Sequence, residues 1–273
     1  MFADLHLHTH FSDGTFSPEE VTERAAKAGL SALALTDHDT VDGCQRMEAA
    51  CLEKGIEFIP GCEFTVEQGG NELHLLGYCF NLKNVHLQAT LRKYQEVRRN
   101  RVHEMVVRLN GQGIPLKVER VLELADCEAP GRPHVGRALV EGGHCYTLDE
   151  AFRRYLKKGR PAWAPKAKMS AAEAINMIHV AGGVAVMAHP GITRMNEVIP
   201  DLVAVGLDGL ECFYTRHSTS MTEHYLMCAE RHGLLVTGGS DCHGDNKGEP
   251  LVGRVKLPYE FVKKLKSVAA AMV

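Results

Sequence analysis

The sequence predicts an α/β protein whose strands close into a barrel. Three observations lead to this prediction: short apolar runs alternate with helical segments, about seven such runs occur, and polar residues gather where the runs end. The alternation implies parallel strands joined by right-handed crossovers, and seven strands favour a barrel over an open sheet. A chain of 273 residues with 45% hydrophobic and 24% charged residues can bury one large core.

The expected strands are short runs rich in apolar residues. Residues 3–8 alternate with period two, so His6 and His8 share one face while Leu7 points the other way and packs. The other expected strands are residues 33–36, 56–63, 73–78, 184–189, 207–213 and 234–238.

The expected helices carry start and stop signals. Ser17 with Glu20, and Ser170 with Glu173, form capping boxes, and these two helices end near Gly29 and Gly182. Further helices are expected before Gly55, over residues 222–233 and over residues 259–272.

The alternation stops between residues 85 and 166. Three helices are expected there, over residues 87–110, 117–125 and 148–158, with no strand between them. The stretch from Lys83 to Lys168 holds 18 Lys and Arg against nine Asp and Glu, a net charge of +9, while the remainder carries −12. The sequence therefore predicts a barrel of residues 1–84 and 167–273, and a basic helical insertion of residues 85–166 that caps the site and attracts an anion.

Several classes of protein are excluded or disfavoured. No run of 18 apolar residues exists and the first residues do not resemble a secretory signal, so no membrane association is expected. Nine scattered cysteines without a C-x-x-C pair indicate reduced thiols and a cytoplasmic location. The phosphate loop, the H-E-x-x-H helix and the G-x-S-x-G elbow are all missing, and no obligate protein partner is evident.

Nine imidazole and carboxylate side chains lie at the ends of the expected strands. They are His6, His8, Asp13, His38, Glu63, His74, His189, Asp241 and His243. Asp241 and His243 repeat the two-residue spacing of His6 and His8, and a metal would offset the cost of burying Glu63. Cys62 and Cys242, which alternate with these ligands, are expected to face away.

This ligand set favours Mn²⁺, Fe²⁺ or Zn²⁺, and nine ligands exceed the needs of one ion. Two or three divalent ions sharing a carboxylate are therefore expected. Such clusters hydrolyse phosphate esters, because they make hydroxide from water near neutral pH and neutralise charge on the phosphoryl oxygens.

The motifs L-H-L-H-T-H-F-S-D-G, L-T-D-H-D-T, P-G-C-E-F, E-L-H-L-L-G-Y, A-H-P-G and G-S-D-C-H resemble the PHP (polymerase and histidinol phosphatase) superfamily over nearly the whole chain. The resemblance implies a distorted (β/α)7 barrel with a trinuclear metal site. It assigns the first metal to His6, His8, Glu63 and Asp241. It assigns the second to Asp13, His38 and His243, and the third to Glu63, His74 and His189, with Glu63 bridging.

The insertion and its G-R-P-H-V-G-R-A-L-V motif resemble the branch of 3′,5′-nucleoside bisphosphate phosphatases and 5′→3′ exoribonucleases that act on short RNA. The resemblance places Arg132 and His134 at the R-x-H position of that branch. Arg132 would clamp a phosphate, and His134 would bind it or protonate near the departing oxygen. Arg137, one turn further on, would lie near the same helix face.

The expected substrate is a small nucleotide phosphate or a short RNA. Two alternatives stay open at this point. One is a histidinol-phosphatase-like phosphomonoesterase, and the other is a non-catalytic PHP module that binds metal.

Overall fold

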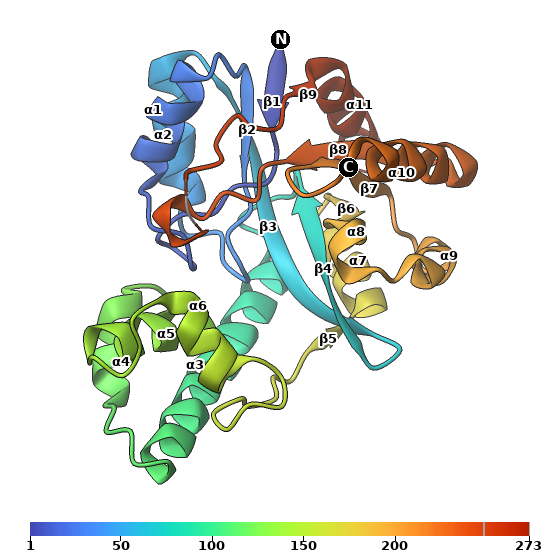
Figure 1. The fold of residues 1–273 in the computed structure, drawn as a ribbon. Helices are drawn as coiled ribbons and strands as arrows, with labels where there is room; N and C mark the ends of the chain where they lie inside the picture. Colours follow the sequence, from blue (N-terminus) through green and yellow to red (C-terminus); the bar gives the residue numbers. More distant parts are fainter. Residues whose placement is uncertain (248, 273) are drawn as a thin grey trace.

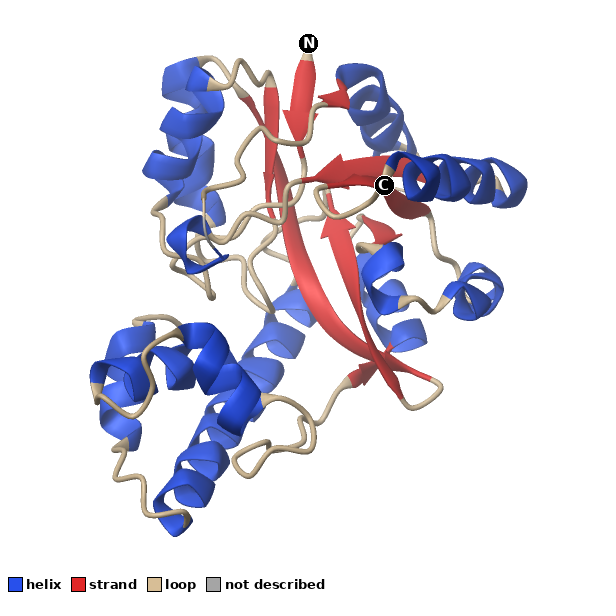
Figure 2. Ribbon diagram, viewed as in Figure 1, coloured by secondary structure: helices blue, strands red, loops and turns tan. Residues whose placement is uncertain are grey.

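A curved nine-stranded sheet forms the centre of the molecule (Figures 1 and 2). The structure is a computed structural model that describes residues 1–247 and 249–272. The strands are β1 (Phe2–Asp4), β2 (Ala32–Leu35), β3 (Glu57–Gln68), β4 (Asn71–Tyr78), β5 (Met169–Ser170), β6 (Val184–Met187), β7 (Gly209–Tyr214), β8 (Leu235–Gly239) and β9 (Leu257–Pro258). Their order is β8-β7-β6-β4-β3-β2-β1-β9, with β5 paired to β3.

The segment that follows β1 approaches β8 and the residues after it, which nearly closes the sheet into a barrel. The Leu5 N–H donates to the Gly238 carbonyl at 3.0 Å, and the Asp241 N–H donates to the His6 carbonyl at 2.8 Å. The seven strands that surround the barrel are the seven expected from the sequence, so the predicted α/β barrel is confirmed. The first strand is shorter than expected, because regular pairing ends at Asp4, after which Leu7 forms an isolated bridge to Cys242.

One strand runs against the expected direction. β4 is antiparallel to both β3 and β6, whereas the sequence suggested parallel strands throughout. β3 continues to Gln68 and turns directly into β4 through Gly69 and Gly70, whose φ angles are +58° and +78°. Two successive glycines in this left-handed region form a tight hairpin, which replaces a helical crossover.

Helices cover the outside of the barrel. They are α1 (Pro18–Lys27), α2 (Cys44–Lys54), α7 (Ala171–Val180), α8 (Pro190–Thr193), α9 (Ile199–Ala204), α10 (Thr219–His232) and α11 (Tyr259–Ala270), with short 3-10 turns at Asn196–Val198 and Gly244–Lys247. Both expected capping boxes, at Ser17 and Ser170, are confirmed. Within the described residues, no helix has the length and apolar character needed to cross a bilayer.

The basic segment forms a group of helices beside the barrel (green in Figure 1). It consists of α3 (Val85–Gly111), α4 (Val118–Ala125), α5 (Arg132–Glu141), α6 (Leu148–Ala151) and the π-helix η1 (Phe152–Leu156). These helices bury a cluster of their own, including Val102, Met105, Leu139 and Leu156. The helix α5, which starts at Arg132, was not among the three expected in this segment, although Arg132, His134 and Arg137 were expected to lie on a helix.

Candidate metal centre

The predicted ligands reach one end of the barrel from different elements. His6 and His8 follow β1, His38 follows β2, His189 follows β6, and Asp241 and His243 follow β8. Asp13 lies in the loop before α1. These positions agree with ligands placed at the carboxyl ends of barrel strands.

The direction of β4 decides where His74 lies. His74 is near the start of β4, so in a parallel strand it would lie at the far end of the barrel from the other ligands. Because β4 is antiparallel, His74 pairs with Thr65 and lies beside Glu63, with 2.7 Å between His74 Nδ1 and Glu63 Oε1. The sequence predicts Glu63 at the end of its strand. In the structure Glu63 lies inside β3, which continues to Gln68.

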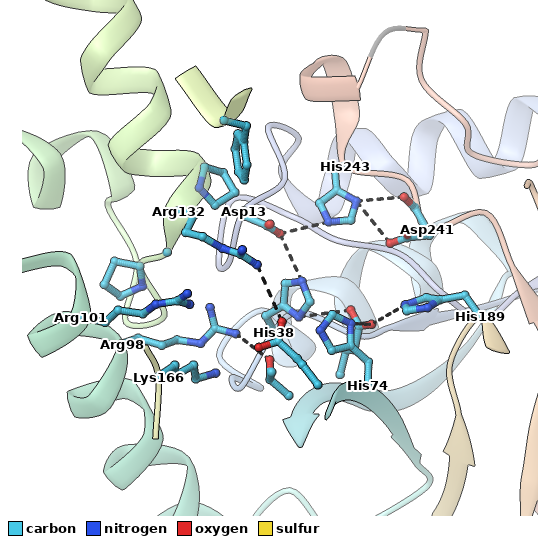
Figure 3. A pocket seen from close by; sticks show the side chains of 17 residues that line it. Asp13, His38, His74, Arg98, Arg101, Arg132, Lys166, His189, Asp241 and His243 are labelled. Carbon is cyan, nitrogen blue, oxygen red and sulfur yellow. Dashed lines mark hydrogen bonds and ion pairs between the residues drawn. The ribbon is translucent and has the colours of Figure 1, made fainter. Parts of the chain in front are cut away.

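Glu63 is the centre of the cluster. Figure 3 shows His38, His74 and His189 gathered at one side of the cavity. Its carboxylate is buried and has five histidines around it. The Glu63 Oε2 atom lies 3.3 Å from His6 Nε2, 3.2 Å from His8 Nε2 and 3.2 Å from His38 Nδ1, and Oε1 lies 3.1 Å from His189 Nε2 and 2.7 Å from His74 Nδ1.

Asp13 and Asp241 extend the cluster on either side of His8. Asp13 Oδ1 lies 3.2 Å from His243 Nε2, and Asp241 Oδ1 lies 3.2 Å from His8 Nε2. The structure therefore brings all nine predicted ligands together in one connected group of side chains.

Within this group, three sets of ligand atoms each lie close enough together to surround an ion. The first set is His6, His8, Glu63 and Asp241; the second is His8, Asp13, His38 and His243; the third is His38, Glu63 and His74. The first set equals the expected one. The second adds His8, and the third contains His38 where His189 was expected.

Buried polar atoms of the cluster test whether metal ions fit there. Among the described residues, seven such atoms lack a hydrogen-bond partner: His6 Nε2, both ring nitrogens of His8, Asp13 Oδ1, His38 Nδ1, Glu63 Oε2 and His189 Nδ1. Each unpaired buried group costs about 1–3 kcal/mol. Burial would raise the pKa of Glu63, but His38 and His74 hold it well below its usual range, so the carboxylate is ionised. An ionised carboxylate surrounded by unpaired imidazole nitrogens fits divalent metal binding.

Side chains behind the ligands fix their orientation. Glu211 is fully buried; its Oε1 lies 2.9 Å from His6 Nδ1, and its Oε2 accepts the His189 N–H at 2.7 Å. The Tyr214 hydroxyl donates to Asp241 Oδ2 at 2.9 Å. Neither residue was predicted from the sequence, although Glu211 stands inside an apolar strand where an unpaired carboxylate would be costly.

Two of the ligands have backbone conformations that side chains rarely adopt. His189 has a φ angle of +31° and Asp241 one of +53°. Such conformations cost about 1–3 kcal/mol and occur where the surrounding structure enforces them, often at functional sites.

A cavity of about 240 Å³ lies beside the ligands, with basic residues on its opposite wall (Figure 3). Arg132 lines it, as its expected role requires, together with Arg98, Arg101 and Lys166, which the sequence did not single out as individual contacts. For Arg98 and Arg101 the sequence predicts a general attraction of anions and no specific contact, and for Lys166 the basic composition of the segment is the only signal. Their meeting beside the ligands depends on the fold.

His134 and Arg137 are not among the residues that line this cavity. The fully buried His134 accepts the Gly131 N–H at Nδ1, at 3.0 Å, and burial together with Arg137 lowers its pKa to about 4. Arg137 Nη2 donates to the carbonyls of Asp13 and Gly14, at 2.9 and 3.1 Å. Both side chains thus lie between α5 and the loop that carries Asp13. Cys62 and Cys242 are buried in the apolar core, as expected.

A barrel mouth with a shared carboxylate, clustered imidazoles and a basic wall defines the class of metal-dependent phosphoester hydrolases. This chain belongs to the PHP domain family, whose domain matches residues 4–162.

Named relatives agree with this assignment. The chain is 34% identical over 259 residues to a 3′,5′-nucleoside bisphosphate phosphatase of Chromobacterium violaceum, covering 93% of this chain and 91% of the relative. It is 36% identical over 248 residues to a 5′-3′ exoribonuclease of Haemophilus influenzae, covering 88% and 89%.

A solved structure of a candidate metal-dependent phosphoesterase from Bifidobacterium adolescentis aligns with a TM-score of 0.90 at 33% identity, covering 97% of this chain and 96% of that one. The comparisons confirm both the family and the enzyme class, a phosphoester hydrolase.

Proposed function

We propose that this enzyme is a cytoplasmic phosphoesterase that uses two or three divalent ions to release phosphate from 3′,5′-nucleoside bisphosphates or nucleotides from the 5′ end of short RNA. The observation that carries the proposal is the nine-ligand cluster facing a basic wall across one cavity. The similarity to a bisphosphate phosphatase and to an exoribonuclease supports this substrate class. The nine cysteines, all within the described residues, are free thiols, as suits a reducing compartment.

Mn²⁺, Fe²⁺ or Zn²⁺ would be held by the nine residues of the cluster, with Glu63 shared between ions. When bound, such ions activate water near neutral pH and neutralise charge on the phosphoryl oxygens. The reaction forms a bond from a water oxygen to phosphorus and breaks the bond from phosphorus to the departing oxygen, which takes up a proton.

Arg132 contacts a phosphate of the substrate in this proposal. Its side chain lines the cavity and is only loosely paired, since Arg132 Nη2 lies 3.8 Å from Glu72 Oε1. A guanidinium in this position can donate two parallel hydrogen bonds to phosphate oxygens.

For His134 the resemblance implies phosphate binding or protonation near the departing oxygen. A positioning role is favoured here, because a buried ring with a pKa near 4 is neutral at pH 7. His134 caps the first turn of α5 through Gly131, and so positions Arg132. In the same way Arg137 positions Asp13 through the backbone of its loop.

A turnover panel tests the proposal. Phosphate or nucleotide release is measured with Mn²⁺ on adenosine 3′,5′-bisphosphate, short 5′-phosphorylated RNA, DNA of the same sequence and histidinol phosphate, with a chelator-treated control. The proposal expects metal-dependent release from the bisphosphate or the RNA. Release from histidinol phosphate alone would support the histidinol-phosphatase alternative. Metal binding without release from any of the four would indicate a non-catalytic module.

A further inference from the structure

Four cationic side chains form the wall of the cavity opposite the metal ligands. This basic wall consists of Arg98 and Arg101 from α3, Arg132 at the start of α5, and Lys166 before β5. Within the described part of the chain, two carboxylates lie within ion-pair distance of the wall. Asp39 Oδ2 accepts from Arg98 Nε and Lys166 Nζ, each at 2.7 Å, and Glu72 lies 3.8 Å from Arg132.

The wall therefore carries more positive charge than its partners neutralise. Four cations face two carboxylates, and Glu72 also pairs with Lys168, with Nζ 3.1 Å from Oε2. The excess of about two positive charges matches a phosphate monoester, which carries up to two negative charges near neutral pH. A phosphodiester, with one negative charge, would leave part of this excess unbalanced.

Among the described residues, Arg101 is the cation of the wall that has no ion-pair partner. Its Nε donates to the Ala164 carbonyl at 2.9 Å, and no carboxylate of the described residues lies within 4.0 Å of its guanidinium. Burial and the neighbouring Arg132 lower the pKa of Arg101 to about 10. A partly buried cation without a counter-charge is costly, and an anion in the cavity would offset that cost.

The start of α5 adds to the positive electrostatic potential of the basic wall. Pro130, Gly131, Arg132 and Pro133 line the cavity, so the amino end of this ten-residue helix faces it. The amino end of a helix carries partial positive charge and favours anions. A side chain at Gly131 would crowd Arg98, because an added Cβ would lie 3.3 Å from Arg98 Nη1.

We propose that the basic wall binds a second phosphate of the substrate, one that does not react, and that Arg101 distinguishes a bisphosphate from a monophosphate. The inference rests on the proposed function, in which the metal centre receives the reacting phosphate. The two sites lie side by side because Asp39, which holds Arg98 and Lys166, directly follows the predicted ligand His38. Both phosphates of one nucleotide can then be bound in a single cavity.

The test compares kcat/KM for a nucleoside 3′,5′-bisphosphate with kcat/KM for the two corresponding monophosphates, in the presence of Mn²⁺. The variants are Arg101→Gln and the charge-retaining Arg101→Lys. The matched control is Arg99→Gln, because Arg99 lies on the same helix but is exposed, pairs with Glu128 and does not line the cavity.

We expect Arg101→Gln to lower kcat/KM for the bisphosphate about 10- to 100-fold, the loss of a charge-assisted hydrogen bond, and to leave the monophosphate that still reacts close to wild type. Arg101→Lys recovers part of the loss, and Arg99→Gln behaves as wild type. Circular dichroism melting checks that each variant is folded. If Arg101→Gln does not fold, Arg101→Lys alone tests the inference, and its kcat/KM must then fall, by a smaller factor, for the bisphosphate and not for the monophosphate.

Two results would overturn the inference. One is an equal fall for bisphosphate and monophosphate, which would place Arg101 at the reacting phosphate or in a structural role. The other is an equal kcat/KM of the wild-type enzyme for the monophosphate and the bisphosphate, which would mean that the second phosphate contributes nothing. That result would not contradict the proposed phosphoesterase function. A wild-type enzyme that hydrolyses none of these substrates contradicts the proposed function itself.

Discussion

Replacing Glu211 by Gln is expected to weaken metal binding without changing any ligand. The Glu211 carboxylate lies 2.9 Å from the ring nitrogen Nδ1 of His6 and accepts a hydrogen bond from the backbone N–H of His189 at 2.7 Å. It therefore holds two of the predicted ligands at once. When Glu211 accepts a hydrogen bond from the Nδ1–H group of His6, the Nε2 lone pair of His6 stays directed toward Glu63 and Asp241, where an ion would bind.

A Gln side chain cannot make both contacts. If its oxygen faces His6, its amide group meets the His189 N–H and two donors oppose each other. If its amide group faces His6, the ring must accept at Nδ1 and carry its proton on Nε2, in the place of the ion. Loss of such a partner typically weakens metal affinity about 10- to 100-fold, and the unpaired buried donor costs about 1–3 kcal/mol of stability.

The assay is a competition titration of metal-free protein with Mn²⁺ or Zn²⁺ against a chelator of known affinity, together with thermal unfolding of the metal-free protein. Glu230→Gln on the exposed face of α10 is the matched control. Wild-type metal affinity in Glu211→Gln, measured on a folded protein, would refute the reasoning about the His6 tautomer.

Three further predictions follow from the site. His189→Ala removes a partner of Glu63 and is expected to lower kcat about 100-fold while the protein stays folded by circular dichroism; unchanged turnover would remove His189 from the catalytic site. Arg132→Lys keeps the charge but loses the paired donors, so KM for the substrate rises about tenfold and kcat changes little; an unaltered KM would argue against phosphate contact. The pKa of His134 is lowered to about 4 in the folded protein, below its value of about 6.5 in the unfolded chain. Between these two pH values the unfolded chain binds a proton that the folded protein does not, so the free energy of unfolding decreases as pH falls from about 6.5 to 4. His134→Gln, which can still accept the Gly131 N–H, should lose about 3 kcal/mol less of its free energy of unfolding than the wild type over that pH interval, as measured by denaturant unfolding. An equal loss in the two proteins would contradict a buried, neutral His134 ring.

The barrel and its ligands were readable from the sequence because their signals are local. Period-two runs, capping boxes at Ser17 and Ser170, and spaced pairs such as His6 and His8 each depend on residues close in the chain. The strand direction of β4 was missed, although Gly69 and Gly70 between two apolar runs are a recognised hairpin signal. Assuming a crossover at that point would have separated His74 from Glu63.

The basic wall could not be read from the sequence, because its members come from distant parts of the chain. Asp39 meets Arg98 and Lys166 across separations of 59 and 127 residues, and only the packing of α3 against the barrel brings them together. The role of Glu211 was hidden for the same reason, since its partner His6 is 205 residues away. Composition indicated that an anion would be attracted but not which side chains would hold it.

Direct location of the metal ions in a crystal is the most direct test. Anomalous diffraction from crystals soaked in Mn²⁺, with elemental analysis of the freshly purified protein, reports both the number of ions and their positions. We expect at least two peaks, one surrounded by His6, His8, Glu63 and Asp241. No bound transition ion in the purified protein, and no peak among the nine ligands after soaking, would contradict the conclusion that these side chains converge to hold metal.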